Sequence, residues 1–169
     1  MVKTRHTIVA LVGNKPGVLT RMASLFRRRG YNIESIAVGH SEIPDLSRMT
    51  IVVNGTDTLL EQVRKQLNKV VDVVKVVDVT GDNVTARELA LIKVKATSST
   101  RSEIIEIVDI FRAKIVDVSQ DSLTIEITGD EEKLESLLKL LRKFGIREIA
   151  RTGRIAMQRG QTRSAKEAP

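Results

Sequence analysis

The sequence predicts an α+β fold made of two tandem βαββαβ sandwiches. Two observations carry this prediction: strand-like and helix-like periodicities follow one another in the order βαββαβ over the first 80 residues, and the same order recurs after a polar, turn-prone break at residues 80–83. With 169 residues, each half can bury a modest core of its own. We therefore expect each unit to stack two helices on one face of a four-stranded antiparallel sheet.

The first four expected elements are a strand, a helix and two further strands. Residues 8–12 are apolar at every position, which predicts a strand buried on both faces, so that something must cover the face turned away from the helices. Residues 18–26 carry apolar side chains at helical spacing, and Gly30 would end this helix in a left-handed cap. The β-rich residues 31–38 and 49–53 predict two strands joined by a long hairpin connection.

A second helix and a fourth strand complete the N-terminal unit. Thr58 and Glu61 have the spacing of a capping box, and apolar side chains recur at helical spacing over residues 59–67. Residues 73–79 are rich in valine and predict the closing strand. These segments give the order βαββαβ.

The C-terminal unit repeats the pattern. Its expected elements are a strand at residues 88–96, a helix with apolar positions at 104–111 behind a possible capping box of Thr100 and Glu103, a strand at 123–127, a helix capped by Asp130 with Gly145 behind it, and a strand at 146–150. The strand at 123–127 alternates apolar with polar side chains, which is typical of an antiparallel strand with one face in water. Both units then have the ferredoxin-like βαββαβ architecture.

Three segments of the chain are expected to differ in their organisation. The first domain would span residues 1–80, the second residues 81–155, and a basic tail residues 156–169. The chain carries a formal net charge of +7, and residues 151–169 hold five basic side chains against one acidic side chain. Because a terminus of this composition is typically solvated, we expect the tail to be disordered.

The composition excludes several kinds of site. The chain has no cysteine, which excludes disulfides, thiol nucleophiles and thiolate metal sites and fits a reducing compartment. No apolar run approaches the roughly eighteen residues of a membrane span, and the N-terminus lacks the apolar core of a secretory signal. We expect a cytoplasmic protein without a membrane segment.

Catalysis finds little support in the sequence. His6 and His40 are the imidazole candidates, and neither stands near a serine and carboxylate set or at a metal-ligand spacing. We interpret both as surface or strand-end histidines. Glu131 and Glu132 open a helix and are interpreted as complementing its dipole. With phosphate-loop and dinucleotide-binding motifs also absent, we expect no catalytic residue and no metal ligand.

Nucleic acid is an alternative ligand class, because βαββαβ is also the topology of the RNA recognition motif. That motif stacks bases on exposed aromatic side chains. This chain has one tyrosine and three phenylalanines, and all three phenylalanines fall on apolar helix stripes. The basic tail could still contact phosphate, but nucleic acid is not the partner that we expect.

The loop between the first strand and the first helix is the most informative segment, with the sequence Asn14-Lys15-Pro16-Gly17. Pro16 suits a first helical turn because the N–H that it lacks would have no partner, and Gly17, without a Cβ, lets a ligand approach the backbone. Free backbone N–H groups at a helix start favour an anion, so a carboxylate is the expected ligand. The alternative is that the Pro-Gly pair simply makes a strand-to-helix turn.

Several segments resemble the ACT domain of the small, regulatory subunit of acetolactate synthase, also called acetohydroxyacid synthase. They are residues 14–19, residues 25–36 with the motif Gly30-Tyr31-Asn32-Ile33-Glu34-Ser35, and Leu46-Ser47-Arg48-Met49-Thr50-Ile51. Residues 88–95 and 110–118 resemble the second domain of that subunit. The resemblance covers nearly the whole chain short of the tail, and departs from the family at Lys15-Pro16 and at the extended basic end.

The resemblance implies a regulatory role. Subunits of this family bind the catalytic large subunit of branched-chain amino-acid synthesis, raise its activity, and confer feedback inhibition by valine or a related amino acid. Thiamine diphosphate, magnesium and FAD would then belong to the large subunit, and this chain would hold no cofactor. The alternative is a free-standing ACT-type amino-acid sensor that acts on another target, such as a nucleic acid.

The expected effector site joins the first loop to the start of the second strand. The residues expected to bind the effector are Asn14, Gly17, Val18, Leu19, Asn32 and Ile33. Backbone N–H groups of the glycine and valine would hold the carboxylate, the two asparagine amides would bridge the polar ends, and the leucine and isoleucine would line the aliphatic end. If the strand that begins at Asn32 lies at a sheet edge, it can face the first loop of a second copy, and the effector would sit between the subunits of a homodimer.

Overall fold

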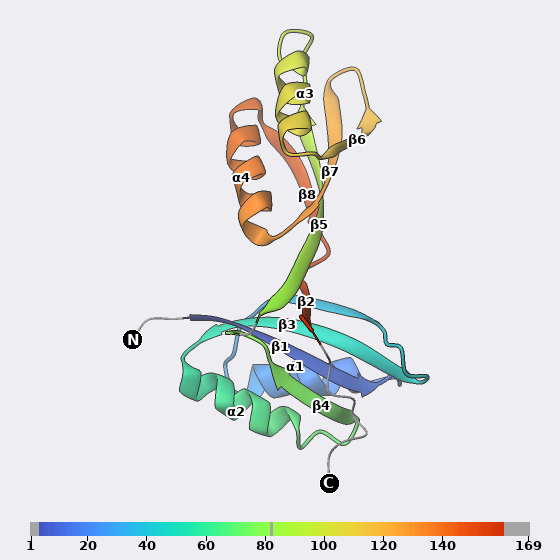
Figure 1. Cartoon of the computed structure of the whole chain (residues 1–169), viewed down its shortest axis with the longest axis vertical. Helices are drawn as coiled ribbons and strands as arrows, with labels where there is room; N and C mark the ends of the chain where they lie inside the picture. The colour runs from blue at the N-terminus through green and yellow to red at the C-terminus, as the bar shows by residue number, and fades with distance from the viewer. Residues whose placement is uncertain (1–3, 82, 161–169) are drawn as a thin grey trace. The chain divides into compact units, whose positions relative to one another are not determined.

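The computed structural model describes residues 4–81 and 83–160 of the chain. They divide into two compact units, coloured along the chain in Figure 1. One unit comprises the chain up to Thr85 together with the residues from Arg154 onward, and the other is Ala86–Gly153. The first unit therefore draws on both ends of the described chain, whereas the sequence predicted it from residues 1–80 alone.

The first unit has a four-stranded antiparallel sheet in the order β2-β3-β1-β4. Its elements are β1 (Thr4–Gly13), α1 (Val18–Arg28), β2 (Ile33–His40), β3 (Leu46–Gly55), α2 (Asp57–Leu67) and β4 (Val73–Asp78). Both helices cover the same face of the sheet (Figure 1). The predicted order βαββαβ is confirmed, and Gly30 follows α1 with the positive φ of 67° that a left-handed cap needs.

The core of the first unit lies between this sheet and its two helices. Ile8 and Ile51 point into it from the central strands, and Met22, Phe26 and Val63 enter from the helices, each no more than 1% exposed. These residues set the apolar periodicity in the sequence. Because burying each large apolar side chain contributes about 1.5–3 kcal/mol, this layer fixes the position of α1 against the sheet.

The opposite face of the sheet is also buried, as the uninterrupted apolar run in β1 predicted. Val9 and Leu11 of β1 and Val52 of β3 are each no more than 7% exposed. A short strand, β9 (Ile155–Gln158), contacts both β1 and β3, and its Ala156 is 2% exposed. The C-terminal end of the described chain thus helps to cover the first sheet.

This strand corrects the expected tail. Residues 156–158 belong to β9, which pairs with the long strand β5 (Val84–Lys95). Just beyond it, the backbone N–H of Arg159 donates to the carbonyl of Asn83 at 2.9 Å. Residues 161–169, for which we also expected disorder, lie outside the described residues.

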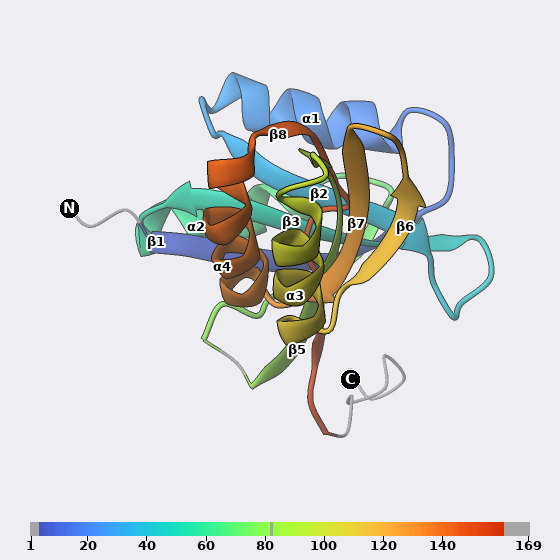
Figure 2. The same cartoon turned by 90° about the horizontal axis from the view of Figure 1, so that it is seen from above.

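The second unit repeats the architecture, with strand order β6-β7-β5-β8 (Figure 2). Its other elements are α3 (Arg101–Ile110), β6 (Lys114–Val118), β7 (Ser122–Gly129), α4 (Glu131–Leu141), a 3-10 turn (Arg142–Phe144) and β8 (Ile146–Arg151). β6 supplies the fourth strand that the predicted sheet requires. Among the described helices, none has the length and apolarity needed to cross a membrane.

Of the three helix caps predicted from the sequence, one is present in the structure. The carboxylate of Asp130 accepts the N–H of Lys133 at 2.9 Å, so the predicted cap of α4 is confirmed. Thr100 precedes α3 as predicted, but its hydroxyl accepts the N–H of Thr97 instead of capping the helix. Thr58 lies inside α2, so the capping box predicted there is wrong.

A charged network holds the second sheet to α4. The guanidinium of Arg151 donates from Nε and Nη2 to both oxygens of the buried Glu88, at 2.7 and 2.9 Å, and from Nη1 to Glu135 at 2.8 Å. The hydrogen bonds to Glu88 raise the pKa of Arg151 above its ordinary value. Because every charged group in this network has a partner, we assign it a structural role.

Candidate effector-binding site

The loop of residues 14–17 connects the end of β1 to the start of α1. The backbone N–H of Asn14 donates to the carbonyl of Asp45 at 2.8 Å, and that of Lys15 donates to Gly13 at 3.0 Å. Gly17 is the N-cap of α1 with φ 85°, and a Cβ placed on it would meet no atom within 4 Å. Positive φ favours glycine here, and the space beside it is open to a ligand.

The start of α1 presents unused donors, which together we call the anion seat. Among the described residues, no hydrogen bond uses the backbone N–H of Gly17, Leu19 or Thr20, and that of Val18 makes a long bond of 3.4 Å to Lys15. The first turn of α1 carries no acidic side chain that could satisfy them. The helix start therefore suits an anion, because the N–H groups and the helix dipole both favour negative charge there.

Four of the six predicted site residues come together at this loop. Asn14 and Gly17 lie on the loop, and Val18 and Leu19 follow as the first residues of α1. The side chain of Val18 is buried in the core, so only its backbone faces the loop, whereas the side chain of Leu19 is 50% exposed. Pro16 precedes the helix and does not lie in its first turn, which corrects its predicted position.

The end of β2 lies beside the same loop. The side-chain amide Nδ2 of Asn14 is 3.4 Å from Nδ1 of His40, which is the last residue of β2 and is exposed. Sequence reasoning treats His40 as incidental. His40 lies close to Asn14 because of the sheet register, which pairs Gly13 with Leu46 and His40 with Ser47. No local sequence motif indicates this register.

Asn32 and Ile33 lie at the other end of the sheet. Asn32 is exposed just before β2, and the half-buried Ile33 packs against the first core and pairs with Val53. Gly13, next to Asn14, pairs with Leu46 at the start of β3, whereas Ile33, next to Asn32, pairs with Val53 near its end. Asn14 and Asn32 of the same chain therefore lie at opposite ends of the sheet. β2 does lie at the edge of the described sheet. An effector site shared between two copies of the chain requires this position.

Asp72 ties the loop to the segment before β4, a contact that sequence reasoning missed. Its carbonyl accepts the N–H of Gly13 at 2.7 Å, and its carboxylate accepts Nη1 of Arg21 at 2.5 Å. The Asp72 side chain is only 14% exposed. One residue thus fixes both the end of β1 and the first half of α1, on either side of the anion seat.

The hairpin between β2 and β3 forms the other wall of the loop. Its Glu42 accepts two hydrogen bonds from Nη2 of Arg48, at 2.9 and 3.1 Å. A hydrogen bond from its own backbone N–H and the neighbouring Arg48 hold the pKa of Glu42 below its ordinary value. Both effects favour the ionised form of the Glu42 carboxylate, which is paired with Arg48.

His6 does not belong to the site. It is 1% exposed within β1, so its interpretation as a surface histidine is corrected. Its Nε2 lies 3.2 Å from the carbonyl of Gly55, which gives it a structural partner in β3. Within residues 4–81 and 83–160, no three His, Asp or Glu side chains are grouped so that they could hold a metal ion.

Both units match family models. Residues 8–75 match the acetohydroxyacid synthase small subunit-like ACT domain, and residues 87–160 match the small subunit of acetolactate synthase. The two matches are separated by residues 76–86 and together extend over most of the chain.

Individual proteins are similar along almost the whole chain. A probable acetolactate synthase small subunit of Archaeoglobus fulgidus is 58% identical over 156 residues, covering 92% of this chain and 98% of the relative. The acetolactate synthase small subunit of Mycolicibacterium smegmatis is 59% identical over 155 residues, covering 92% and 91%. The crystal structure of the acetolactate synthase small subunit from Thermotoga maritima superposes with a TM-score of 0.86 at 48% identity, covering 94% of this chain and 99% of that one. The chain therefore belongs to the family of acetolactate synthase small subunits, the regulatory and non-catalytic component of that enzyme.

Proposed function

We propose that this chain binds the catalytic large subunit of acetolactate synthase, raises its activity, and lowers that activity when valine or a related branched-chain amino acid occupies the anion seat at the start of α1. Family membership supports the partner. The unused N–H groups of Gly17, Leu19 and Thr20 support the ligand class, because they can bind a carboxylate without displacing any internal hydrogen bond.

The amino acid would be held by polar and apolar contacts together. Its carboxylate would accept from the free N–H groups, a dipole-assisted interaction of about 0.3–1 kcal/mol per charge and up to roughly 2 kcal/mol when partly buried. Burying its aliphatic side chain against Leu19 and Ile33 would add about 1.5–3 kcal/mol. The amide oxygens of Asn14 and Asn32 would accept from its ammonium group.

A second copy of the chain would complete this site. Two β2 edge strands that pair antiparallel about a two-fold axis bring the start of one strand beside the end of the other. The end of β2 is where His40 meets Asn14, so Asn32 of the partner subunit would arrive beside the loop. The observation that supports this proposal is that β2 is an edge strand of the described sheet, with Asn32 just before its start and His40, beside Asn14, at its end.

A ligand shared by two chains can act as a regulator. It binds the paired arrangement better than separated chains, and so shifts the population toward one packing of the dimer that the large subunit senses. The proposal assigns thiamine diphosphate, magnesium and FAD to the large subunit. Because a cysteine-free chain suits a reducing compartment, we also propose the cytoplasm as its location.

The test is to mix the chain with an acetolactate synthase large subunit and to measure turnover with and without valine. We expect turnover to rise on mixing and to fall again as valine is added. Unchanged turnover on mixing would reject the regulatory role. Retardation of nucleic acid by the chain in electrophoresis would instead support the free-standing sensor.

A further inference from the structure

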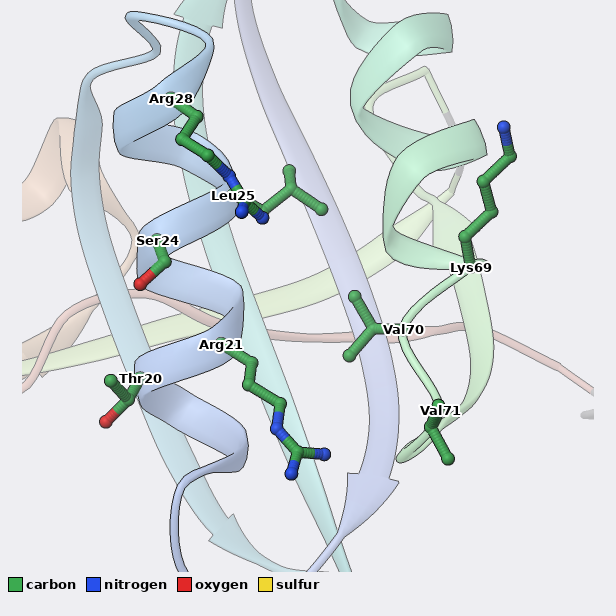
Figure 3. Close-up of a pocket in the computed structure, with 8 residues that line it drawn as sticks. All are labelled: Thr20, Arg21, Ser24, Leu25, Arg28, Lys69, Val70 and Val71. Carbon is green, nitrogen blue, oxygen red and sulfur yellow. The ribbon is translucent and has the colours of Figure 1, made fainter.

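A groove of about 610 Å³ runs along α1, on the side that faces the connection between α2 and β4 (Figure 3). Arg21, Leu25 and Arg28 line it from α1, and Lys69 and Val70 line it from the connection. In Figure 3, the side chains of Leu25 and Val70 point toward one another across the groove. All of these residues belong to the first unit. Thr20, whose backbone N–H belongs to the anion seat, also lines the groove, so the groove adjoins the seat.

The charge along this groove has one sign. Three of its lining side chains are cationic and none is acidic. α1 carries three arginines and no acid, whereas α2, α3 and α4 each mix both signs. The helix dipole favours Arg28 near the end of α1 but disfavours a cation such as Arg21 near its start, so the dipole does not account for the pattern. Asp72 neutralises Arg21, while Arg28 and Lys69 have no acidic partner among the described residues.

Apolar side chains accompany these cations at the surface. Val71, also in the groove lining, is 91% exposed, and Val74 on the edge strand β4 is 60% exposed. Exposed aliphatic groups beside a charged groove are typical of a surface that a protein partner covers. A small anion would leave both valines in water.

The spacing of the cations also favours a protein. Arg21 and Arg28 are seven residues apart, which is about 10 Å along a helix, and Lys69 lies on the opposite wall of the groove. This spacing is wider than one carboxylate or phosphate group, so a ligand that engages all three cations presents more than one anionic group. Several acidic side chains on a folded surface can engage them together.

We propose that this groove, with the exposed Val71 in its lining, docks an acidic surface of the catalytic large subunit that also presents an apolar side chain. The inference rests on the proposed function, because it assumes that partner. It adds the location: the docking surface is the helical side of the first unit, and the edge strand β2 stays free for a second copy of the chain.

The test compares two charge-reversed versions of the full chain for binding to the large subunit. The double variant Arg28→Glu and Lys69→Glu changes two groove cations, and the control Lys114→Glu with Lys139→Glu makes the same charge change at exposed positions of the second unit. We expect the groove variant to bind about tenfold more weakly or worse, with a flatter dependence of affinity on salt, and the control to bind as wild type does.

The outcomes separate the two levels of inference. Calorimetric titration with valine reports the anion seat, and we expect equal valine affinity in all three proteins, which also shows that the variants are folded. If wild type and the groove variant bind the large subunit equally well, the proposed docking surface is wrong and the proposed function still stands. The same conclusion follows if the control variant loses as much affinity as the groove variant.

If wild type neither binds the large subunit nor changes its turnover, the proposed function fails and the docking surface fails with it. A variant Val71→Asp supplies an independent check, and undiminished binding by it would exclude the apolar part of the surface.

Discussion

Gly17 combines a backbone requirement with a chemical one. Its φ of 85° disfavours other residues, and the space beside it is empty within 4 Å. A Cβ added there would contact no atom beyond its neighbours in the chain, so a substitution would reach the space that we propose for the effector's carboxylate. This makes Gly17 the residue at which the anion seat can be blocked without disturbing the core.

The variant Gly17→Asp is expected to abolish feedback inhibition while it leaves activation of the large subunit intact, because its carboxylate would occupy the place of the effector's own charge. Gly17→Asn is the matched control, since asparagine tolerates positive φ and carries no charge. We expect the control to retain inhibition at higher valine concentration. Turnover of the mixed subunits against valine measures both, and equal inhibition of Gly17→Asp and wild type would rule out the seat.

Asn32 tests the shared site. Asn32→Ala removes one amide from the effector's polar contacts and should weaken valine binding by about 1–3 kcal/mol, with an unchanged circular dichroism spectrum. Asn68→Ala removes an exposed amide just after α2 and should have no effect. Isothermal calorimetry compares the two. If Asn32→Ala binds valine as tightly as wild type, Asn32 does not belong to the site.

The site residues differ in how far the sequence could predict them. Gly17 and Leu19 are local, because a strand-to-helix loop with Pro-Gly indicates free N–H groups from a few adjacent residues alone. His40 and Asp72 are not local, because the sheet brings them to the loop from distant parts of the chain. His40 lies 26 residues downstream of Asn14, and Asp72 belongs to the segment before β4. Sequence periodicity predicts which face a residue occupies, but not its neighbour on another strand.

At the scale of elements, helix caps show which local rules hold. Asp130 caps α4 through the N–H of Lys133, whereas Thr58 has a capping-box spacing and yet lies inside α2. The spacing alone does not decide, because a threonine inside the helix no longer stands at the position from which a side chain reaches the first free N–H groups. The longer elements were predictable, since long apolar periodicities specify them, whereas the five-residue strand β6 was not among the predicted elements.

The variant Asp130→Ala is expected to lower the free energy of unfolding of the second unit by about 0.5–2 kcal/mol, since it leaves a first-turn N–H without its partner. Thr58→Ala is expected to change it little, because the exposed threonine makes no cap. Urea denaturation followed by circular dichroism measures both. Equal destabilisation by the two substitutions would contradict the assigned caps.

At the scale of the whole molecule, the short strand β9 was beyond sequence prediction. Its residues, Ile155–Gln158, are too few to show a period and adjoin a basic stretch that is typical of a solvated terminus. The need for it was nonetheless visible at the other end of the chain, where the apolar run of β1 required cover on a second face.

A truncation after Gly81 is expected to be less stable than the first unit in the intact chain, by about 2 kcal/mol or more, because Val9, Leu11 and Val52 lose the strand that contacts theirs. The matched control joins residues 1–85 to 154–160 through a short glycine-rich linker and restores β9. Denaturation midpoints and binding of a hydrophobic dye compare the two. Equal midpoints and equal dye binding would show that β9 contributes nothing to the cover.

The return of the chain to its starting unit also has a consequence for biosynthesis. A ribosome releases the N-terminal sheet early, but the strand that shields its outer surface emerges only after the whole inserted unit has been made. The first unit is therefore complete only after the second unit has been made, and until then the aliphatic side chains on the outer face of its sheet are accessible to chaperones and to premature association with neighbouring chains.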